Sequence, residues 1–127
     1  MNLMEAKELK KGSYIMFNNE PHQVTRKEVV VFGTHSHSKL KVYLRPFTGG
    51  GEKTATFQHH DFVEALDIMR KSGQVIAKTS AGLQIMDGHS YETLEATADP
   101  ELLEEINEGD QVTFIDYNNN VRVLEKR

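Results

Sequence analysis

The sequence contains no cysteine, no tryptophan and only three prolines among its 127 residues. The absence of cysteine excludes disulfides, thiolate nucleophiles and cysteine-based zinc sites. With aromatic residues at 8% of the chain, any core must rest on valine, isoleucine, leucine, phenylalanine and methionine. A chain of this length can form two domains of roughly 60 residues, each with a thin core.

No hydrophobic run reaches the roughly 18 residues that a membrane-spanning helix needs. Residues 1–12 carry three lysines and two glutamates and lack the apolar segment of a signal peptide. The hydrophobic fraction of 38% is typical of a globular chain and not of a disordered one. We therefore expect a cytoplasmic protein with no membrane partner.

The net charge of −4 is distributed unevenly. Residues 1–71 hold 11 Lys and Arg against 8 Asp and Glu, whereas residues 72–127 hold 4 against 11. Two interpretations remain open on charge alone. The first half contacts RNA, or the chain simply has a solvated acidic surface beside a nearly neutral one.

Turn residues recur every eight to twelve positions, which is typical of β-barrels and sandwiches. In the first half we expect a turn at 18–21, because Asn tolerates positive φ and Pro cannot continue a central strand, and a hairpin turn at 48–52. The expected strands there are 13–17, 22–32, 39–45 and 53–57. The small and polar residues 33–38 predict an exposed, mobile loop.

The polar residues 71–73 are the expected boundary between two domains. In the second half Asp99 is the expected N-cap of a helix, with Pro100 at its first position. The strands expected around that helix are 74–79, 83–87, 91–95, 111–117 and 121–125. This order predicts an all-β protein, with an SH3-like barrel at 1–71 and an OB-fold barrel with one short helix at 72–127.

Three patterns suggest chemistry only weakly. The histidines His35, His37, His59 and His60 lack a third convergent metal ligand. Residues 49–53 lack the spacing of a phosphate-binding loop, and no helix follows them. Ser36 beside His37 would not be preorganised in an exposed loop. We therefore expect no enzymatic activity, no catalytic residue, no metal, no cofactor and no small-molecule substrate.

The strand beginning at Lys39 has a clear alternation. Leu40, Val42 and Leu44 predict a buried face. The opposite face carries Lys39, Lys41, Tyr43 and Arg45. Three cations and one aromatic ring along a strand suit phosphate contact with base stacking, although a plain solvated face would look the same.

The chain also resembles the archaeal and eukaryotic translation initiation factor five-A family, to which bacterial elongation factor P is more distantly related. Its likeness runs from Leu9 to the C-terminus and is carried by several short segments. They are Leu9-Lys10-Lys11-Gly12-Ser13-Tyr14-Ile15, Asn19-Glu20-Pro21-His22-Gln23-Val24, Gln84-Ile85-Met86-Asp87, Ser90-Tyr91-Glu92-Thr93 and Glu108-Gly109-Asp110-Gln111-Val112. The resemblance implies a two-barrel protein that binds ribosomal RNA and peptidyl-tRNA and assists peptide-bond formation.

The resemblance implies that the loop of the first barrel is the working tip, with the family pattern G-K-H-G-x-A-K. Here the same positions read Gly33-Thr34-His35-Ser36-His37-Ser38-Lys39. Thr34 stands where the family has the lysine that is converted to hypusine. Because threonine has no amine, the chain is not expected to be a substrate of the hypusine-forming enzyme.

The leading hypothesis is a ribosome-binding initiation or elongation factor that positions peptidyl-tRNA without hypusine. Its predicted contacts are the loop residues Gly33, Thr34, His35, Ser36, His37 and Lys39 and the RNA-facing residues Lys41, Tyr43 and Arg45. The alternatives are a dormancy factor that occupies the ribosome, a structural self-assembling paralogue, and a free RNA-binding module.

Overall fold

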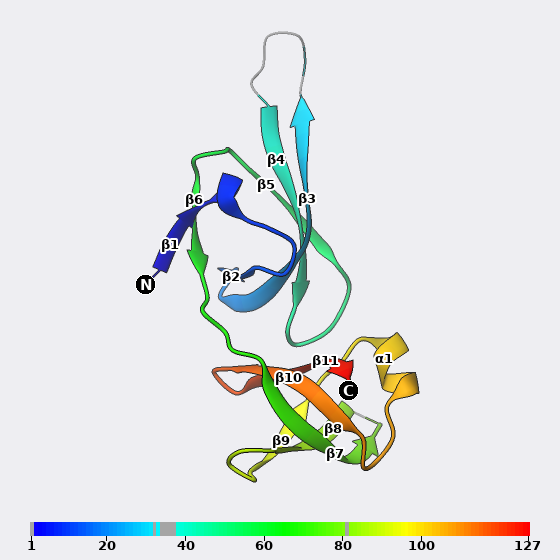
Figure 1. The fold of residues 1–127 in the computed structure, drawn as a ribbon. Coiled ribbons are helices and arrows are strands. Elements are labelled where there is room, and N and C mark those ends of the chain that lie inside the picture. The colour runs from blue at the N-terminus through cyan, green and yellow to red at the C-terminus, as the bar shows by residue number, and fades with distance from the viewer. Residues whose placement is uncertain (1, 32, 34–37, 81) are drawn as a thin grey trace. The chain divides into compact units, whose positions relative to one another are not determined.

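The structure, a computed structural model, describes residues 2–31, 33, 38–80 and 82–127. These residues form two antiparallel sheets and one short α-helix, which confirms the predicted all-β fold class (Figure 1). The chain divides into two compact units. Unit 1 comprises Met1–Pro46 and Gly50–Asp67, and unit 2 comprises Phe47–Gly49 and Ile68–Arg127. No described helix is both long and apolar enough to cross a membrane.

Unit 1 is a six-stranded sheet in the order β1-β6-β2-β3-β4-β5. Its elements are β1 (Asn2–Glu5), the 3-10 helix η1 (Ala6–Glu8), β2 (Tyr14–Phe17), β3 (Glu20–Val31), β4 (Ser38–Pro46), β5 (Lys53–Phe57) and β6 (Phe62–Ala65). Strands β1 and β6 pair with each other and were not expected from the sequence. Strands β3 and β4 extend past the rest of the sheet as a two-stranded ribbon (Figure 1).

The turn between β2 and β3 is shorter than the sequence predicted. Asn18 and Asn19 both have positive φ, 52° and 63°, as a two-residue type I′ hairpin turn requires. Pro21 is not part of the turn and lies in β3 opposite Met16. The expectation that proline ends the turn was therefore wrong, because two asparagines suffice to reverse the chain.

A β-bulge at Thr25 changes which side chains of β3 face outward. Val24 lies opposite Leu44, but the next paired residue is Arg26, opposite Tyr43. Residues directly opposite each other on antiparallel strands project from the same face of the sheet. The extra residue therefore places Arg26 on the outward face and Lys27 on the core side, opposite Val42.

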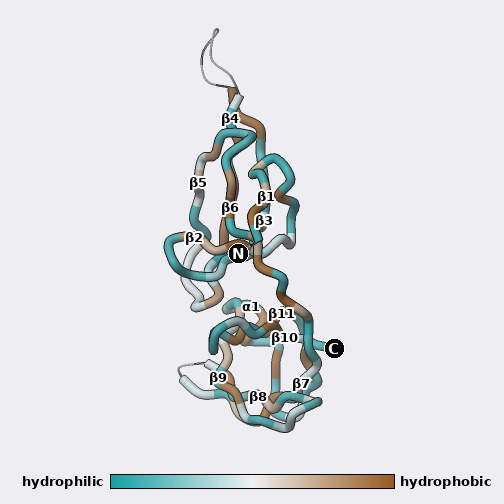
Figure 2. The backbone as a smooth tube through the Cα atoms, turned by 90° about the vertical axis from the view of Figure 1, so that its left-hand side faces the viewer, coloured by the Kyte–Doolittle hydropathy of each residue, from teal (hydrophilic) through white to brown (hydrophobic). Residues whose placement is uncertain are grey.

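The core of unit 1 lies beneath η1 and the inward face of β4. Figure 2 shows hydrophobic stretches recurring along strands of both units. The predicted alternation of β4 is confirmed, because Leu40, Val42 and Leu44 are at most 2% exposed. The other buried members are Ala6, Leu9, Ile15, Val24 and Val63.

Unit 2 is a five-stranded sheet in the order β11-β10-β7-β8-β9. Its elements are β7 (Lys71–Thr79), β8 (Gly82–Asp87), β9 (Thr93–Ala96), α1 (Pro100–Glu105), β10 (Gln111–Tyr117) and β11 (Asn120–Lys126). Three strands, a helix and two strands is the element order expected of an OB-fold barrel. The boundary expected between residues 71 and 72 lies at the start of β7, whereas the compact units change between Asp67 and Ile68.

The helix of unit 2 begins where the sequence predicted, with Asp99 as N-cap and Pro100 at the first position. The Asp99 side chain makes no capping hydrogen bond. Its carboxylate instead accepts a hydrogen bond from Arg122, whose side chain in β11 is only 4% exposed. An ion pair thus ties the start of α1 to the strand that closes the unit.

Candidate nucleic-acid interface

The outward-facing side chains of β3 and β4 form a surface, called here the outer face. Its members are the opposed pairs Arg26 and Tyr43, Glu28 and Lys41, Val30 and Lys39, and Gln23 and Arg45. The structure places the four residues predicted from the sequence on one side of β4. Arg26 joins them from β3, and the sequence did not reveal it because its orientation depends on the bulge.

Tyr43 is the centre of the outer face. The guanidinium carbon of Arg26 lies 4.0 Å from the centroid of its ring, and the Lys41 ammonium lies 5.2 Å from it. The phenol donates a hydrogen bond of 3.2 Å to Glu28, which also pairs with Arg26 at 3.2 Å. The hydrogen bond with Tyr43 raises the pKa of Arg26, which carries its positive charge at any ordinary pH.

These contacts change what the outer face can do chemically. The sequence suggested that Tyr43 stacks on a base, but Arg26 and Lys41 already lie over its ring. Cations held on an aromatic ring remain able to bind anions at their outward side. The geometry therefore favours contact with phosphate oxygens along a nucleic-acid backbone over stacking on a base.

Of the predicted loop, residues 33–38, the structure describes only Gly33 and Ser38. Gly33 is exposed and has φ of 75°, a left-handed conformation that glycine adopts readily. Thr34, His35, Ser36 and His37 lie outside the described residues. Past them, the Ser38 hydroxyl is 2.9 Å from Nε2 of His59, so the first residue of β4 is joined to the segment between β5 and β6.

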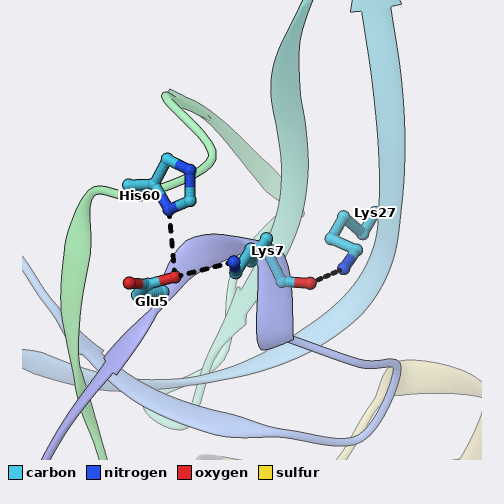
Figure 3. Close-up of polar contacts among 4 residues, drawn as sticks. All are labelled: Glu5, Lys7, Lys27 and His60. Atoms are coloured by element: carbon cyan, nitrogen blue, oxygen red, sulfur yellow. Dashed lines mark hydrogen bonds and ion pairs between the residues drawn. The ribbon is translucent and has the colours of Figure 1, made fainter.

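The opposite side of the ribbon is joined to the N-terminal segment by polar contacts, which Figure 3 shows. Lys27 donates a 2.6 Å hydrogen bond to the carbonyl oxygen of Lys7 in η1. Glu5 contacts both His60, at 3.1 Å, and Lys7, at 3.2 Å. The pKa of Glu5 is lowered mainly by the hydrogen bond from His60 and, to a smaller extent, by the hydrogen bond from Lys7.

The histidines and the glycine run that suggested chemistry only weakly in the sequence make structural contacts or form a turn. His59 contacts Ser38 and His60 contacts Glu5, and no group of three or more potential ligands among the described residues could hold a metal ion. Gly49 and Gly50 have positive φ, 94° and 97°, in the connection between β4 and β5. That connection is the expected hairpin turn.

Comparison with known proteins finds several relatives that share one name, although no family model matches the chain. It is 30% identical over 115 residues to translation initiation factor 5A of Methanopyrus kandleri, covering 89% of this chain and 85% of that protein. It is 32% identical to the factor of the same name from Korarchaeum cryptofilum, covering 86% and 83%. Its identity to the factor from Hyperthermus butylicus is 34%, covering 84% and 80%.

Solved structures give the same result. The fold is similar to that of eukaryotic translation initiation factor 5A from Methanococcus jannaschii, with a TM-score of 0.74 and 28% identity, covering 99% of this chain and 94% of that one. A translation initiation factor eif-5a family protein from Naegleria fowleri has a TM-score of 0.63 and 21% identity, covering 99% and 97%. The second likeness concerns the fold alone.

Proposed function

This chain belongs to the translation initiation factor 5A family, and we propose that it is a translation factor that binds the ribosome through unit 1 without a hypusine side chain. The observation that carries this proposal is the outer face, where cations at alternate positions of β4 are joined by Arg26 from β3. The contribution of the protein is then binding and orientation, with no enzymatic step.

The outer face supplies the affinity in this proposal. Side chains two residues apart on a strand are separated by about 6.8 Å, so Lys39, Lys41 and Arg45 can contact phosphates at several points along an RNA backbone. The contacts of Arg26, Glu28 and Lys41 with Tyr43 restrict the motion of these four side chains before RNA binds. Less conformational entropy is therefore lost in the complex.

The loop supplies the effect on peptidyl-tRNA. Once the outer face is bound, residues 33–39 are held at one place on the ribosome, and peptidyl-tRNA beside them is restrained in orientation. Restraint of reacting groups can accelerate a reaction without any covalent step. Thr34, at the position of the family's modified lysine, offers a hydroxyl and a methyl group where the family has a long cation.

The experiment that tests ribosome binding is co-sedimentation of the purified protein with ribosomes from its own source across a salt series. The variant Lys41→Gln removes one cation of the outer face, and Lys78→Gln removes an exposed cation from β7 as a matched control. We expect Lys41→Gln to weaken binding about fivefold and to reduce the slope of log K against log salt by about 1. Lys78→Gln should behave as the wild type.

Three results would contradict the proposal. Equal weakening by both lysine variants would mean that charge in general, and not the outer face, attracts the ribosome. Failure of the wild type to sediment at low salt would favour self-assembly or a free RNA-binding module, which light scattering and titration with short RNA would separate. If binding is seen without faster peptide-bond formation at a polyproline stall, the protein is a dormancy factor.

The absence of hypusine is tested by mass spectrometry. Trypsin cleaves after Lys27 and Lys39, so one peptide, residues 28–39, contains the whole loop. In protein isolated from its own source we expect this peptide to have the mass of its unmodified sequence. Lys39 is the only lysine of this peptide, and trypsin cleaves poorly after a modified lysine. An aminobutyl-type addition found in a longer peptide, residues 28–41, would therefore show that the modifying chemistry is retained at another position.

A further inference from the structure

The turn between β8 and β9, residues 88–92, is held rigidly by a buried carboxylate. Asp87 is only 7% exposed. Its side chain accepts hydrogen bonds from the backbone N–H groups of His89, at 2.8 Å, and Ser90, at 3.2 Å. The bond from His89 is the main reason that the pKa of Asp87 is lowered. Gly88 donates a 2.9 Å bond to the carbonyl oxygen of Ser72, which fixes the turn to β7.

This rigid turn presents one aromatic side chain to solvent. Tyr91 is 72% exposed, although its backbone N–H donates a 2.9 Å hydrogen bond to the carbonyl oxygen of Asp87. Its φ is +62°, which a bulky residue adopts only under strain. A ring held outside the core at the expense of backbone strain points to a contact made outside this chain.

A cavity of about 570 Å³ lies beside the turn. The two chain neighbours of Tyr91, Ser90 and Glu92, both line it. Leu94 gives it an apolar part, and Glu92 and Asp116 add carboxylates. The remaining lining residues are Lys71, Ser72, Asp87, Gly88 and His89.

The charge of this region decides between possible partners. The cavity is lined by one basic side chain, Lys71, and by the carboxylates of Asp87, Glu92 and Asp116. Residues 68–127 as a whole carry 6 Lys and Arg against 11 Asp and Glu, so the surroundings favour a cation over a phosphate group. A cation on a long aliphatic chain fits each part of the region. Its stem can pack on Leu94, its charge can pair with Glu92 or Asp116, and a neighbouring cation can lie on the ring of Tyr91.

We infer that the turn 88–92 and its cavity form a docking site for an arginine- or lysine-rich segment of a partner protein. This site is in unit 2, shares no residue with the outer face, and goes beyond the proposed function. It does not require that the chain bind the ribosome. The acidic half of the chain then has a binding role separate from that of the basic half.

The test is titration of the full chain with a fluorescein-labelled nine-residue arginine peptide at low and moderate salt. Tyr91→Asn removes the ring and keeps a residue that tolerates positive φ, so the fold is preserved. We expect Tyr91→Asn and Glu92→Gln each to weaken peptide binding about fivefold. Phe62→Thr is the matched control, because it removes an exposed ring that lies in unit 1 and not in unit 2. This variant should leave binding unchanged.

Several outcomes would overturn the inference. Equal binding of the peptide by wild type and Tyr91→Asn, or no binding at all, would show that the turn is not a docking site. A labelled single-stranded RNA that binds in place of the peptide and loses affinity in Tyr91→Asn would identify Tyr91 as a base-stacking residue instead. Because ribosomes are absent from the assay, the result is independent of the sedimentation experiment.

Discussion

Replacing Gly82 by alanine is expected to lower the free energy of unfolding of unit 2 by about 3 kcal/mol. Gly82, the first residue of β8, has φ of +151°, a backbone conformation that residues with a Cβ atom rarely adopt. A methyl group there would also lie 2.7 Å from the carbonyl oxygen of Ala96, well inside van der Waals contact. Both effects act against the substitution, and neither can relax without moving β8 relative to β9.

Two other glycines separate these effects. Gly109 has φ of +90° with nothing near a methyl group, so Gly109→Ala should lose only the backbone preference, about 1–2 kcal/mol. Gly51 has neither constraint, and Gly51→Ala should change stability by less than about 0.5 kcal/mol. Urea unfolding followed by hydrogen exchange of peptides from each unit measures all three. If Gly82→Ala lowers the free energy of unfolding no more than Gly109→Ala does, a methyl group at residue 82 does not clash with the carbonyl oxygen of Ala96.

The second large effect concerns the ion pair between Asp99 and Arg122. Removing the carboxylate with Asp99→Ala leaves the guanidinium buried without this partner, and we expect a loss of about 3 kcal/mol. Arg122→Met keeps the side-chain length and removes the charge. Because the Asp99 side chain is 43% exposed and can be solvated, this variant should lose only about 1 kcal/mol.

The double variant Asp99→Ala with Arg122→Met gives the decisive comparison. It should be as stable as Arg122→Met alone and more stable than Asp99→Ala, since no charge is then left buried. Arg70→Ala is the control for an exposed pair, because Arg70 and Glu125 are both 59% exposed, and it should cost less than about 0.5 kcal/mol. If the double variant is less stable than both single variants, the pair does not behave as a buried ion pair.

Local patterns in the sequence predicted the elements that local forces determine. The alternation of Leu40, Val42 and Leu44 predicted which face of β4 is buried. The pair Asp99-Pro100 predicted where α1 begins. Both signals depend on residues adjacent to the element itself. In contrast, β1 and β6 are short strands that pair across about 60 residues of chain, and neither has a pattern strong enough to be recognised by itself.

Contacts between distant residues explain what the sequence did not reveal about the candidate site. The lysines of β4 were predicted to share a face, but nothing near Tyr43 in the sequence indicates that Arg26 lies over its ring. Likewise, Asp99 was expected at a helix cap, but its side chain pairs with a residue 23 positions away. Alternation along an uninterrupted strand predicts which way a side chain points, whereas bulges and contact partners depend on how strands pair.

The bulge at Thr25 exchanges the two faces of β3, so that side chains after it point to the opposite side from the one that the alternation before it predicts. Before it, odd-numbered residues such as Gln23 face outward; after it, even-numbered residues such as Arg26 and Glu28 do. Two relatives with the same letters over residues 26–31 would therefore expose different surfaces if one of them lacked the extra residue. Comparison of binding surfaces within the family must therefore align bulges as well as amino acids. One unpaired residue decides whether the odd- or the even-numbered residues of the rest of the strand face outward.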